Sequence, residues 1–309
     1  MTSGVQRASA SVPAIVEVGD RSASGGSRHA GLRGRGTQAS GASILVHVAL
    51  YAGFVVMAIP FVWMLLSSFK STPELRRWPP TWIPQERTTE NYRELFSRLD
   101  FPRFFLNSTI AALAVTAGNV LLCSLVGYAL AKLPFPGKRL LLAVILGSMM
   151  IPAFVTFMPL FVFVANMNLT DTRAGLILPF LAGGFGAFLM RQYILGLPDE
   201  LLDAARVDGA GEFRIFFRIV LPLCGPALAT LGVLTFLTNW NSFLWPLVVA
   251  SSEDMYTLPV ALALFSTGQQ RSNIALQMAG AVVVVLPVVV LFFAMQRYVI
   301  RGIATTGIK

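Results

Sequence analysis

Six long apolar segments, separated by polar stretches, dominate this chain of 309 residues. A helix needs about 20 mostly apolar residues to cross the hydrocarbon core of a bilayer. The segments that reach this length are 44–66, 108–130, 140–164, 175–194, 221–249 and 278–295. Only helices and closed barrels satisfy their backbone in lipid, and barrel strands would alternate apolar and polar residues. The pattern therefore predicts an all-α membrane protein with six transmembrane helices.

Charged residues are nearly absent from these segments, since Arg191, close to a segment end, is the one Lys, Arg, Asp or Glu that they contain. The third segment includes Pro152, and the fourth includes Gly183, Gly184 and Gly186. Glycines in a span allow close packing of helices or a bend, which we favour over a role in substrate binding. The fifth segment is long enough to tilt or break.

Composition supports the membrane class, because 55% of the residues are hydrophobic and 13% are charged, against about 25% charged in soluble domains. The net charge of +9 is spread between the apolar segments, which favours anchoring of cytoplasmic loops over a nucleic-acid partner. Cys123 and Cys224 fall in or beside apolar segments, so we expect free buried thiols. His29 and His47 are too few and too far apart to indicate a metal site.

The ends of the chain set the expected topology. Residues 1–40 are rich in Ser, Gly, Ala and Arg, which predicts a disordered cytoplasmic tail ahead of a transmembrane domain at 41–309. With the N-terminus inside, the cytoplasmic segments carry 15 of the 24 Lys and Arg residues, and the tail supplies much of that excess. The positive-inside rule thus predicts that both termini are cytoplasmic. The external loop 67–107, with its tryptophans and prolines, is expected to form an ordered cap.

The loop 197–222 between the fourth and fifth segments contains signals for two helices. Pro198 suits a first helical position, and acidic residues follow it. Leu201, Leu202 and Ala205 have helical spacing, and Gly209 allows a sharp turn. The later Phe213, Phe216 and Phe217 are predicted to form one apolar face.

Two interpretations of this loop remain open from spacing alone. Small residues, namely Ala204, Ala205, Gly209, Ala210 and Gly211, let a backbone approach another surface closely, and the neighbouring acids can pair with cations there. Such a helix is suited to docking in a partner. An amphipathic helix that rests on the membrane surface has the same pattern.

The run "DAARVDGAGEFRIFFRIVLP", from Asp203 to Pro222, resembles the EAA loop of permease subunits in binding-protein-dependent ABC importers. Asp203 stands where glutamate is usual, which keeps the charge and shortens its reach. The resemblance extends over nearly the whole chain after the tail. The segments "NWNSFLWPLVV", "YTLPVALALF" and "QRYVIRGIATTGIK", with "SFK" and "ENYRELF", are similar to the carbohydrate-uptake branch, which includes the shorter permease subunit of the maltose importer.

This resemblance implies a type I ABC importer permease in a bacterial cell membrane, with a cytoplasmic coupling helix between spans four and five. The residues that it assigns to docking on the ATPase are Asp203, Ala204, Ala205, Asp208, Gly209 and Ala210. The implied partners are a second permease subunit, two cytoplasmic ATPase subunits and an extracytoplasmic solute-binding protein. ATP and Mg²⁺ would be bound by the ATPase, since this chain has no Walker A sequence and is not expected to be an enzyme.

A translocation path needs polar groups at membrane depth. The candidates are Asn239, Trp240, Asn241, Ser242 and Trp245, because amides and aromatic faces suit a sugar. An interfacial aromatic belt would have the same composition. Met149, Met150 and Gln277 are weaker candidates, for which core packing is favoured.

The solute class is left partly open by the sequence. A carbohydrate is the expected cargo, and a polyol or a glycerol phosphate is the alternative. An ion-coupled secondary transporter is disfavoured because ionisable residues are nearly absent from the spans. An intramembrane enzyme is disfavoured because no nucleophile–base pair is visible at membrane depth.

Overall fold

The computed structural model describes residues 41–98, 100–267 and 273–306, and every element in them is helical. The predicted tail, 1–40, and His29 lie outside these residues. The elements, which include two 3₁₀ turns (η1, η3) and one π-helical turn (η2), are α1 (Gly41–Ser67), α2 (Thr72–Leu75), α3 (Glu90–Arg98), α4 (Phe101–Lys132), α5 (Lys138–Met150), α6 (Ala153–Asn166), α7 (Arg173–Ile177), η1 (Leu178–Phe180), α8 (Gly184–Leu195), α9 (Asp199–Val207), α10 (Glu212–Ile215), η2 (Phe216–Val220), α11 (Leu221–Leu223), α12 (Gly225–Trp240), α13 (Leu244–Val249), η3 (Glu253–Met255), α14 (Leu258–Thr267) and α15 (Ile274–Thr306).

The chain divides into two units, residues 1–54 and 55–309. The described part of the first unit is the first half of α1, whose apolar side chains are exposed. The second unit holds all the other elements. Three helices, namely α1, α4 and α15, are each long and apolar enough to cross a membrane, and three bent helix pairs pass the same test together. The described residues thus provide up to six spans, as predicted.

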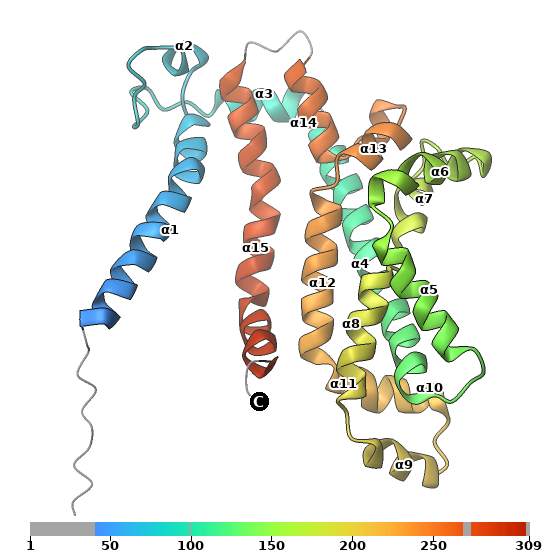
Figure 1. Cartoon of the computed structure of the whole chain (residues 1–309). Helices are drawn as coiled ribbons and strands as arrows, with labels where there is room; N and C mark the ends of the chain where they lie inside the picture. Colours follow the sequence, from blue (N-terminus) through green and yellow to red (C-terminus); the bar gives the residue numbers. More distant parts are fainter. Residues whose placement is uncertain (1–40, 99, 268–272, 307–309) are drawn as a thin grey trace, which may run out of the picture. The chain divides into compact units, whose positions relative to one another are not determined.

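Helices α4 and α8 pack closely against each other, because small residues let their backbones meet (Figure 1). A Cβ added to Gly127 on α4 would lie 2.8 Å from the backbone nitrogen of Arg191 on α8. A Cβ on Gly186 would lie 2.8 Å from the sulfur of Cys123. Close approach through small residues is how helices gain packing energy in lipid, where no hydrophobic effect drives them together. Gly186 therefore serves close packing, one of the two predicted roles. Cys123 and Cys224 are free and buried, as expected.

The third predicted span, 140–164, is two helices instead of one. Helices α5 and α6 meet at 104°, with Pro152 as the residue before α6. Proline lacks an amide donor and disfavours a helical conformation in the residue before it. Ile151 accordingly adopts an extended conformation. The fourth span, 175–194, is bent by 42° between η1 and α8, where Gly183 precedes the first residue of α8.

The fifth predicted span, 221–249, is also divided. The segment 212–223 meets α12 at an angle of 80°, where Cys224 leaves the helical conformation ahead of Pro226. At its other end α12 stops at Trp240, and the separate helix α13 follows. The amides of Asn239 and Asn241 each donate to a carbonyl four residues back, at 2.8 Å. Bonds of this kind compete with regular helix continuation.

Helices α2, α3, α6, α13 and α14 gather at one end of the second unit, called the α3 end below (Figure 1). Here the buried Lys70 donates to the carbonyl of Thr81 and lies 4.6 Å from the centroid of the Trp63 ring. Asn91 donates to the carbonyls of Ser68 and Lys70, each at 2.8 Å. These contacts of Lys70 and Asn91 hold the loop that follows α1 in a defined conformation.

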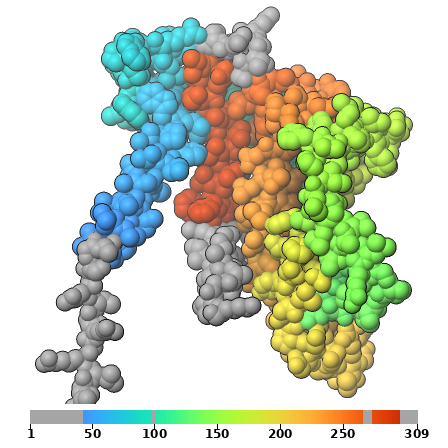
Figure 2. Space-filling model, viewed as in Figure 1, coloured from blue at the N-terminus to red at the C-terminus, as the bar shows by residue number. Residues whose placement is uncertain are grey.

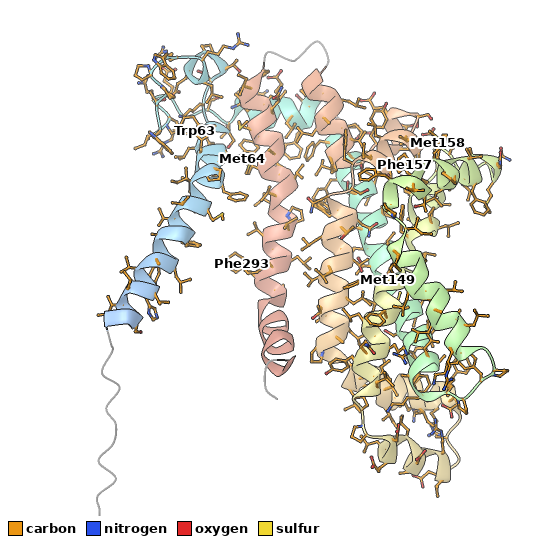
Figure 3. The ribbon with its side chains drawn as sticks, viewed as in Figure 1. Trp63, Met64, Met149, Phe157, Met158 and Phe293 are labelled. Carbon is orange, nitrogen blue, oxygen red and sulfur yellow. The ribbon has the colours of Figure 1, made fainter. Side chains whose placement is uncertain are left out.

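Aromatic and sulfur-containing side chains lie on both sides of the bend between α5 and α6 (Figure 3). Phe157 on α6 contacts the edge of Trp245 at a centroid distance of 5.7 Å. Met149 on α5 packs over Gly184, since a Cβ there would lie 3.0 Å from its Cγ. Met150 is 84% exposed, so the core-packing interpretation fails for it within this chain.

Helix α9 lies at the opposite end of the second unit, called the α9 end (Figure 1). In the space-filling view, α9 and α10 form the projecting tip beneath α4 and α8 (Figure 2). The loop 197–222 and the loop 67–107 are therefore at opposite ends of the helices, as six alternating spans require.

Candidate functional site

Helix α9 has sharply defined ends. Pro198 is the residue before the helix, one position earlier than predicted, and Asp199 and Glu200 occupy the first turn. Their negative charges suit the positive N-terminal end of a helix. At the other end Gly209 has φ of +77°, a left-handed conformation that side chains other than glycine rarely adopt. The predicted sharp turn at Gly209 is confirmed.

One face of α9 is anchored in the core. Leu202 is 2% exposed and packs in a cluster with Ile194 of α8 and Ile215 of α10. Ala205, three residues after Leu202, lies on the same side and is half-buried. Leu201 is 47% exposed and does not share this face as predicted, because adjacent helical residues point about 100° apart.

The opposite face of α9 is open to solvent. Among the residues assigned to docking, Asp203, Ala204, Asp208 and Gly209 are exposed, and Ala205 and Ala210 are half-buried. Val207 is 88% exposed. The structure thus brings the docking candidates together on one projecting element, with short side chains and two carboxylates on its free surface.

Arg206 connects this element to the helix that follows. Its Nη1 donates to Asp203 at 2.8 Å, and its Nε donates to Glu212 at 2.9 Å. The hydrogen bond to Glu212, together with the one to Asp203, raises the pKa of Arg206 by more than burial lowers it. The guanidinium therefore stays charged and holds both carboxylates.

The predicted aromatic face of the loop is divided in the structure. Phe216 is 1% exposed and contacts the ring of Tyr128 at 5.6 Å, whereas Phe213 is 74% exposed and Phe217 is 47% exposed. The spacing rule that grouped them assumes a regular α-helix. A π-helical turn begins at Phe216, so the three rings do not stay in line.

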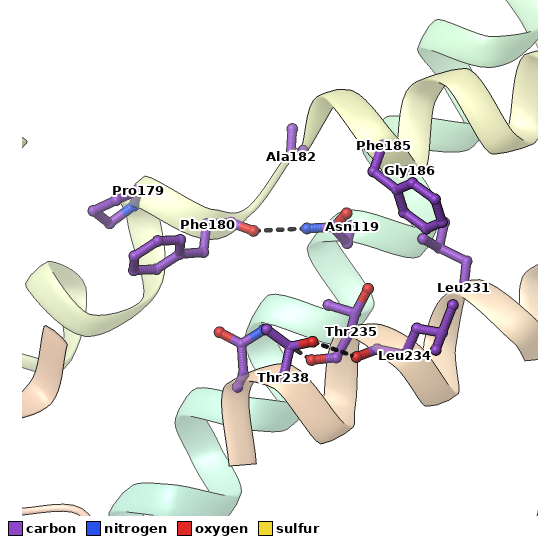
Figure 4. A pocket seen from close by; sticks show the side chains of 12 residues that line it. Asn119, Pro179, Phe180, Ala182, Phe185, Gly186, Leu231, Leu234, Thr235 and Thr238 are labelled. Carbon is purple, nitrogen blue, oxygen red and sulfur yellow. Dashed lines mark hydrogen bonds between the residues drawn. The ribbon is translucent and has the colours of Figure 1, made fainter. Parts of the chain in front are cut away.

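A second candidate site is a cavity of about 430 Å³ between α4, α12 and the linker that joins η1 to α8 (Figure 4). Its size is in the range of small-molecule sites. Every side chain that lines it is uncharged. The lining residues are Asn119, Pro179, Phe180, Ala182, Gly183, Phe185, Gly186, Leu231, Leu234, Thr235, Thr238 and Asn239.

Polar groups reach the cavity from two helices. Asn119 of α4 donates to the carbonyl of Phe180 at 2.7 Å, which fixes the linker before α8. Thr238 donates to the carbonyl of Leu234 at 2.8 Å. The sequence interpretation missed Asn119, Thr235 and Thr238. A polar side chain in the middle of an apolar span is the signal that would have identified Asn119.

Of the five residues predicted for the substrate path, Asn239 lines the cavity. The structure places Trp240 and Trp245 in the packed interior, where they are 1% and 5% exposed. Their indole nitrogens donate to the backbone carbonyls of Val284 and Gly175. Asn241 and Ser242 follow the end of α12, beyond the cavity wall.

Comparisons with known proteins give a consistent result. Residues 123–305 match the family model described as binding-protein-dependent transport system inner membrane component. The arabinooligosaccharides transport system permease protein AraQ of Halalkalibacterium halodurans is 39% identical, over 84% of this chain and 95% of that protein. The sn-glycerol-3-phosphate transport system permease protein UgpE of Yersinia pestis bv. Antiqua is 33% identical, over 85% of this chain and 96% of that protein.

A solved structure shares the fold. It is the crystal structure of a bacterial ABC transporter involved in the import of the acidic polysaccharide alginate. The superposition covers 85% of this chain and 98% of that chain, with a TM-score of 0.75 and 23% identity. The arrangement of helices over this part of the chain is therefore a known fold.

Proposed function

Because this chain belongs to the binding-protein-dependent transport system inner membrane components, we propose that it is the permease subunit of an ATP-driven ABC importer for a carbohydrate. Its place is the bacterial cell membrane, across which it moves the solute by alternating access. The observation that carries this proposal is α9, a helix anchored by the buried Leu202 that presents small and acidic residues on a projecting tip.

The exposed surface of α9 is proposed to dock in a cleft of a cytoplasmic ABC ATPase. Ala204 and Gly209 permit close approach of the two backbones, and Asp203 and Asp208 offer charge to cations of the cleft. Docking on a cytoplasmic ATPase requires a cytoplasmic α9 end, and six alternating spans would put both termini on that same side. The α3 end then faces outward, where an extracytoplasmic solute-binding protein delivers the cargo.

The energy source in this proposal lies in other chains. Two ATPase subunits bind ATP and Mg²⁺ and hydrolyse ATP, and a second permease subunit completes the path. The chain itself positions and gates the solute without covalent chemistry. ATP-driven closure of the ATPase pair moves the docked α9 elements and favours the outward-facing state.

The cavity beside Asn119, Thr238 and Asn239 is the proposed place where this chain contacts the solute. Its lining offers amides, hydroxyls and the Phe185 ring, which suit the hydroxyl groups and C–H faces of a sugar. None of its described lining residues is ionisable. This composition favours a neutral carbohydrate, the class of cargo in the name of the AraQ relative. The alternative is a polyol or a glycerol phosphate, and the name of the UgpE relative supports the glycerol phosphate.

Co-purification tests the coupling role directly. The chain is expressed with its partner permease and the ATPase, and the ATPase retained on a tag of this chain is measured. Asp203→Lys and Gly209→Asp should each release the ATPase. Glu86→Lys makes the charge change of Asp203→Lys at an exposed position at the α3 end and should retain the ATPase. Retention of the ATPase by both α9 variants would overturn the docking role.

Transport assays separate the classes of mechanism and cargo. Proteoliposomes that contain the full complex should accumulate a carbohydrate supplied with its binding protein only when ATP is inside. Uptake driven by an ion gradient without the ATPase would instead support a secondary transporter. Uptake of glycerol phosphate but of no carbohydrate would support the alternative cargo.

A further inference from the structure

The last turn of α4 contacts the α9 region at two separate points. Tyr128 and Lys132 are four residues apart, so they project from the same face of the helix. Both side chains are buried, with Tyr128 3% exposed and the Lys132 side chain 6% exposed. Two polar side chains that are buried at the end of an apolar helix need partners, and both find them in the loop that carries α9.

Lys132 holds the beginning of α9. Its ammonium group donates to the carbonyl of Leu197 at 2.7 Å and to the carboxylate of Asp199 at 2.6 Å. These two acceptors stand on either side of Pro198, the residue before α9. The Lys132 side chain is 6% exposed and the Asp199 carboxylate is 73% exposed, so the contact links the start of α9 to α4 through one charge-assisted pair and one hydrogen bond to the backbone.

Tyr128 holds the other end of α9 through Glu212. The tyrosine hydroxyl donates to Oε2 of Glu212. Oε1 of the same carboxylate accepts from Nε of Arg206, in the last turn of α9, at 2.9 Å. One carboxylate therefore joins α4 to the C-terminal turn of α9.

The segments that connect α9 to its neighbours in sequence are short turns that contain glycine. Gly196 follows α8, and Gly209, with its positive φ, follows α9. Turns of this kind change their backbone angles readily and absorb rotation. Leu202 already holds the buried face of α9 against Ile194 of α8 and Ile215 of α10, and contacts from α4 to both ends of α9 would add a direct link to a long helix.

We propose that Tyr128, Lys132, Arg206 and Glu212 form a clamp that makes α9 and α4 move as one body, so that α4 carries the displacement of α9 to the cavity. Asn119 lies nine residues before Tyr128 on the same helix, about 14 Å along its axis. Its bond to the carbonyl of Phe180 would pass the movement to the linker before α8. This inference rests on the proposed docking of α9 to an ATPase, and it assigns the four residues a positioning role.

The substitutions that test the clamp leave the exposed docking residues of α9 unchanged, and this makes the clamp testable apart from docking. The complex of both permeases, the ATPase and the binding protein is reconstituted in proteoliposomes. The reporter is Leu234→Cys, a half-exposed position in the cavity wall. Its labelling by a membrane-impermeant maleimide is compared with and without ATP and vanadate. Cys123 and Cys224 are buried, and the chain without the reporter measures their background.

The test variant combines Lys132→Met with Glu212→Gln. This double variant should retain the ATPase and its basal hydrolysis. The vanadate-dependent change in labelling should fall roughly fivefold or more, which is the factor by which two coupled sites typically affect each other. Lys132→Arg in place of Lys132→Met keeps a charged donor at this position and should restore most of the vanadate-dependent change in labelling. Lys138→Met is the matched control, because Lys138 caps α4 through the carbonyls of Ala131 and Leu133.

The possible outcomes are distinguishable. A full change in labelling in the double variant overturns the clamp. Loss of the labelling change in the Lys138→Met control would also overturn the clamp, because the loss in the double variant would then reflect lower stability of the end of α4. Absence of a bound ATPase from the parent complex would overturn the proposed function itself. Should the double variant fail to assemble, Tyr128→Phe removes a single hydroxyl, and an unaltered labelling change in that variant counts against the clamp.

Discussion

The indole nitrogen of Trp240 donates a hydrogen bond of 3.0 Å to the backbone carbonyl of Val284, which ties the end of α12 to α15. The ring of Trp240 also stacks on Phe236 at a centroid distance of 5.6 Å and meets the edge of Phe105 at 5.7 Å. Trp240 was a candidate for the substrate path, and these contacts give it a structural role. In a membrane span an indole nitrogen without an acceptor is unfavourable, so this bond also fixes the orientation of the ring.

Trp240→Phe should therefore lower stability and leave the affinity for solute unchanged. Loss of one hydrogen bond between helices costs about 0.6–1.5 kcal/mol, and Trp240→Ala should cost about 3–5 kcal/mol because it also leaves a cavity. Thermal unfolding in detergent measures both effects. Asn241→Ala, at an exposed neighbouring position, is the control and should be close to neutral. A change in transport KM without a change in stability would contradict this assignment.

Asn239 and Asn241 provide a matched pair for testing the path. Both amides donate to a carbonyl four residues back, but Asn239 lines the cavity and Asn241 does not. Asn239→Leu should raise the KM for carbohydrate transport by roughly tenfold, the effect of about one lost hydrogen bond. Asn241→Leu should leave the KM within about twofold. Equal effects of the two changes on the KM would show that the cavity is not the solute path.

The sequence predicted the spans well because burial in lipid demands long apolar runs, and α1, α4 and α15 need no other information. It did not predict the 104° bend at Pro152, since a proline within a span is compatible with either a kink or a break. The physical difference lies in Ile151, which is extended before Pro152, whereas α1 and α15 continue through Pro60 and Pro287.

The two candidate sites differ in how far the sequence defines them. Helix α9 is local, because Asp203 to Gly209 lie on one helix and its turn, so their spacing alone brought them together. The cavity is assembled from α4, α8 and α12, and nothing in the order of residues places Asn119 beside Thr238. The sequence does not separate Trp240 and Trp245, which are buried, from residues that line a path, since an aromatic residue next to amides is equally suited to the packed interior.

The carboxylate of Glu74 should make the stability of the α3 end depend on pH. Burial alone would raise the pKa of Glu74, but hydrogen bonds from the Gln85 amide and the Thr81 hydroxyl, with the charge of Lys70, outweigh it. The pKa therefore lies below its ordinary value of 4.5. A depressed pKa gives stability that is present above 4.5 and is lost as the pH falls through the folded-state value.

We accordingly expect hydrogen exchange in residues 70–91 to accelerate when the pH is lowered from neutral to below 4.5, after correction for the intrinsic rate. Glu74→Gln should accelerate exchange at neutral pH and reduce its dependence on acid. Glu86→Gln, at an exposed carboxylate in the same loop, should behave as the parent chain. Acid-induced loosening of equal size in Glu74→Gln and the parent would assign the effect to another group.

A single methyl group added at Gly186 should push α8 away from α4. A Cβ at this position would lie 2.8 Å from Sγ of Cys123 and 2.9 Å from Oδ1 of Asn119, distances that real contacts do not reach. Gly186→Ala should destabilise the protein by about 1–3 kcal/mol, the usual cost of overpacking, and thermal unfolding would measure it. Adding Cys123→Ala removes the sulfur and should recover part of the loss. Gly147→Ala on α5, where a Cβ has nothing within 4 Å, should be neutral or stabilising. Destabilisation of the same size at both glycines would mean that the close contact between α4 and α8 does not control the response.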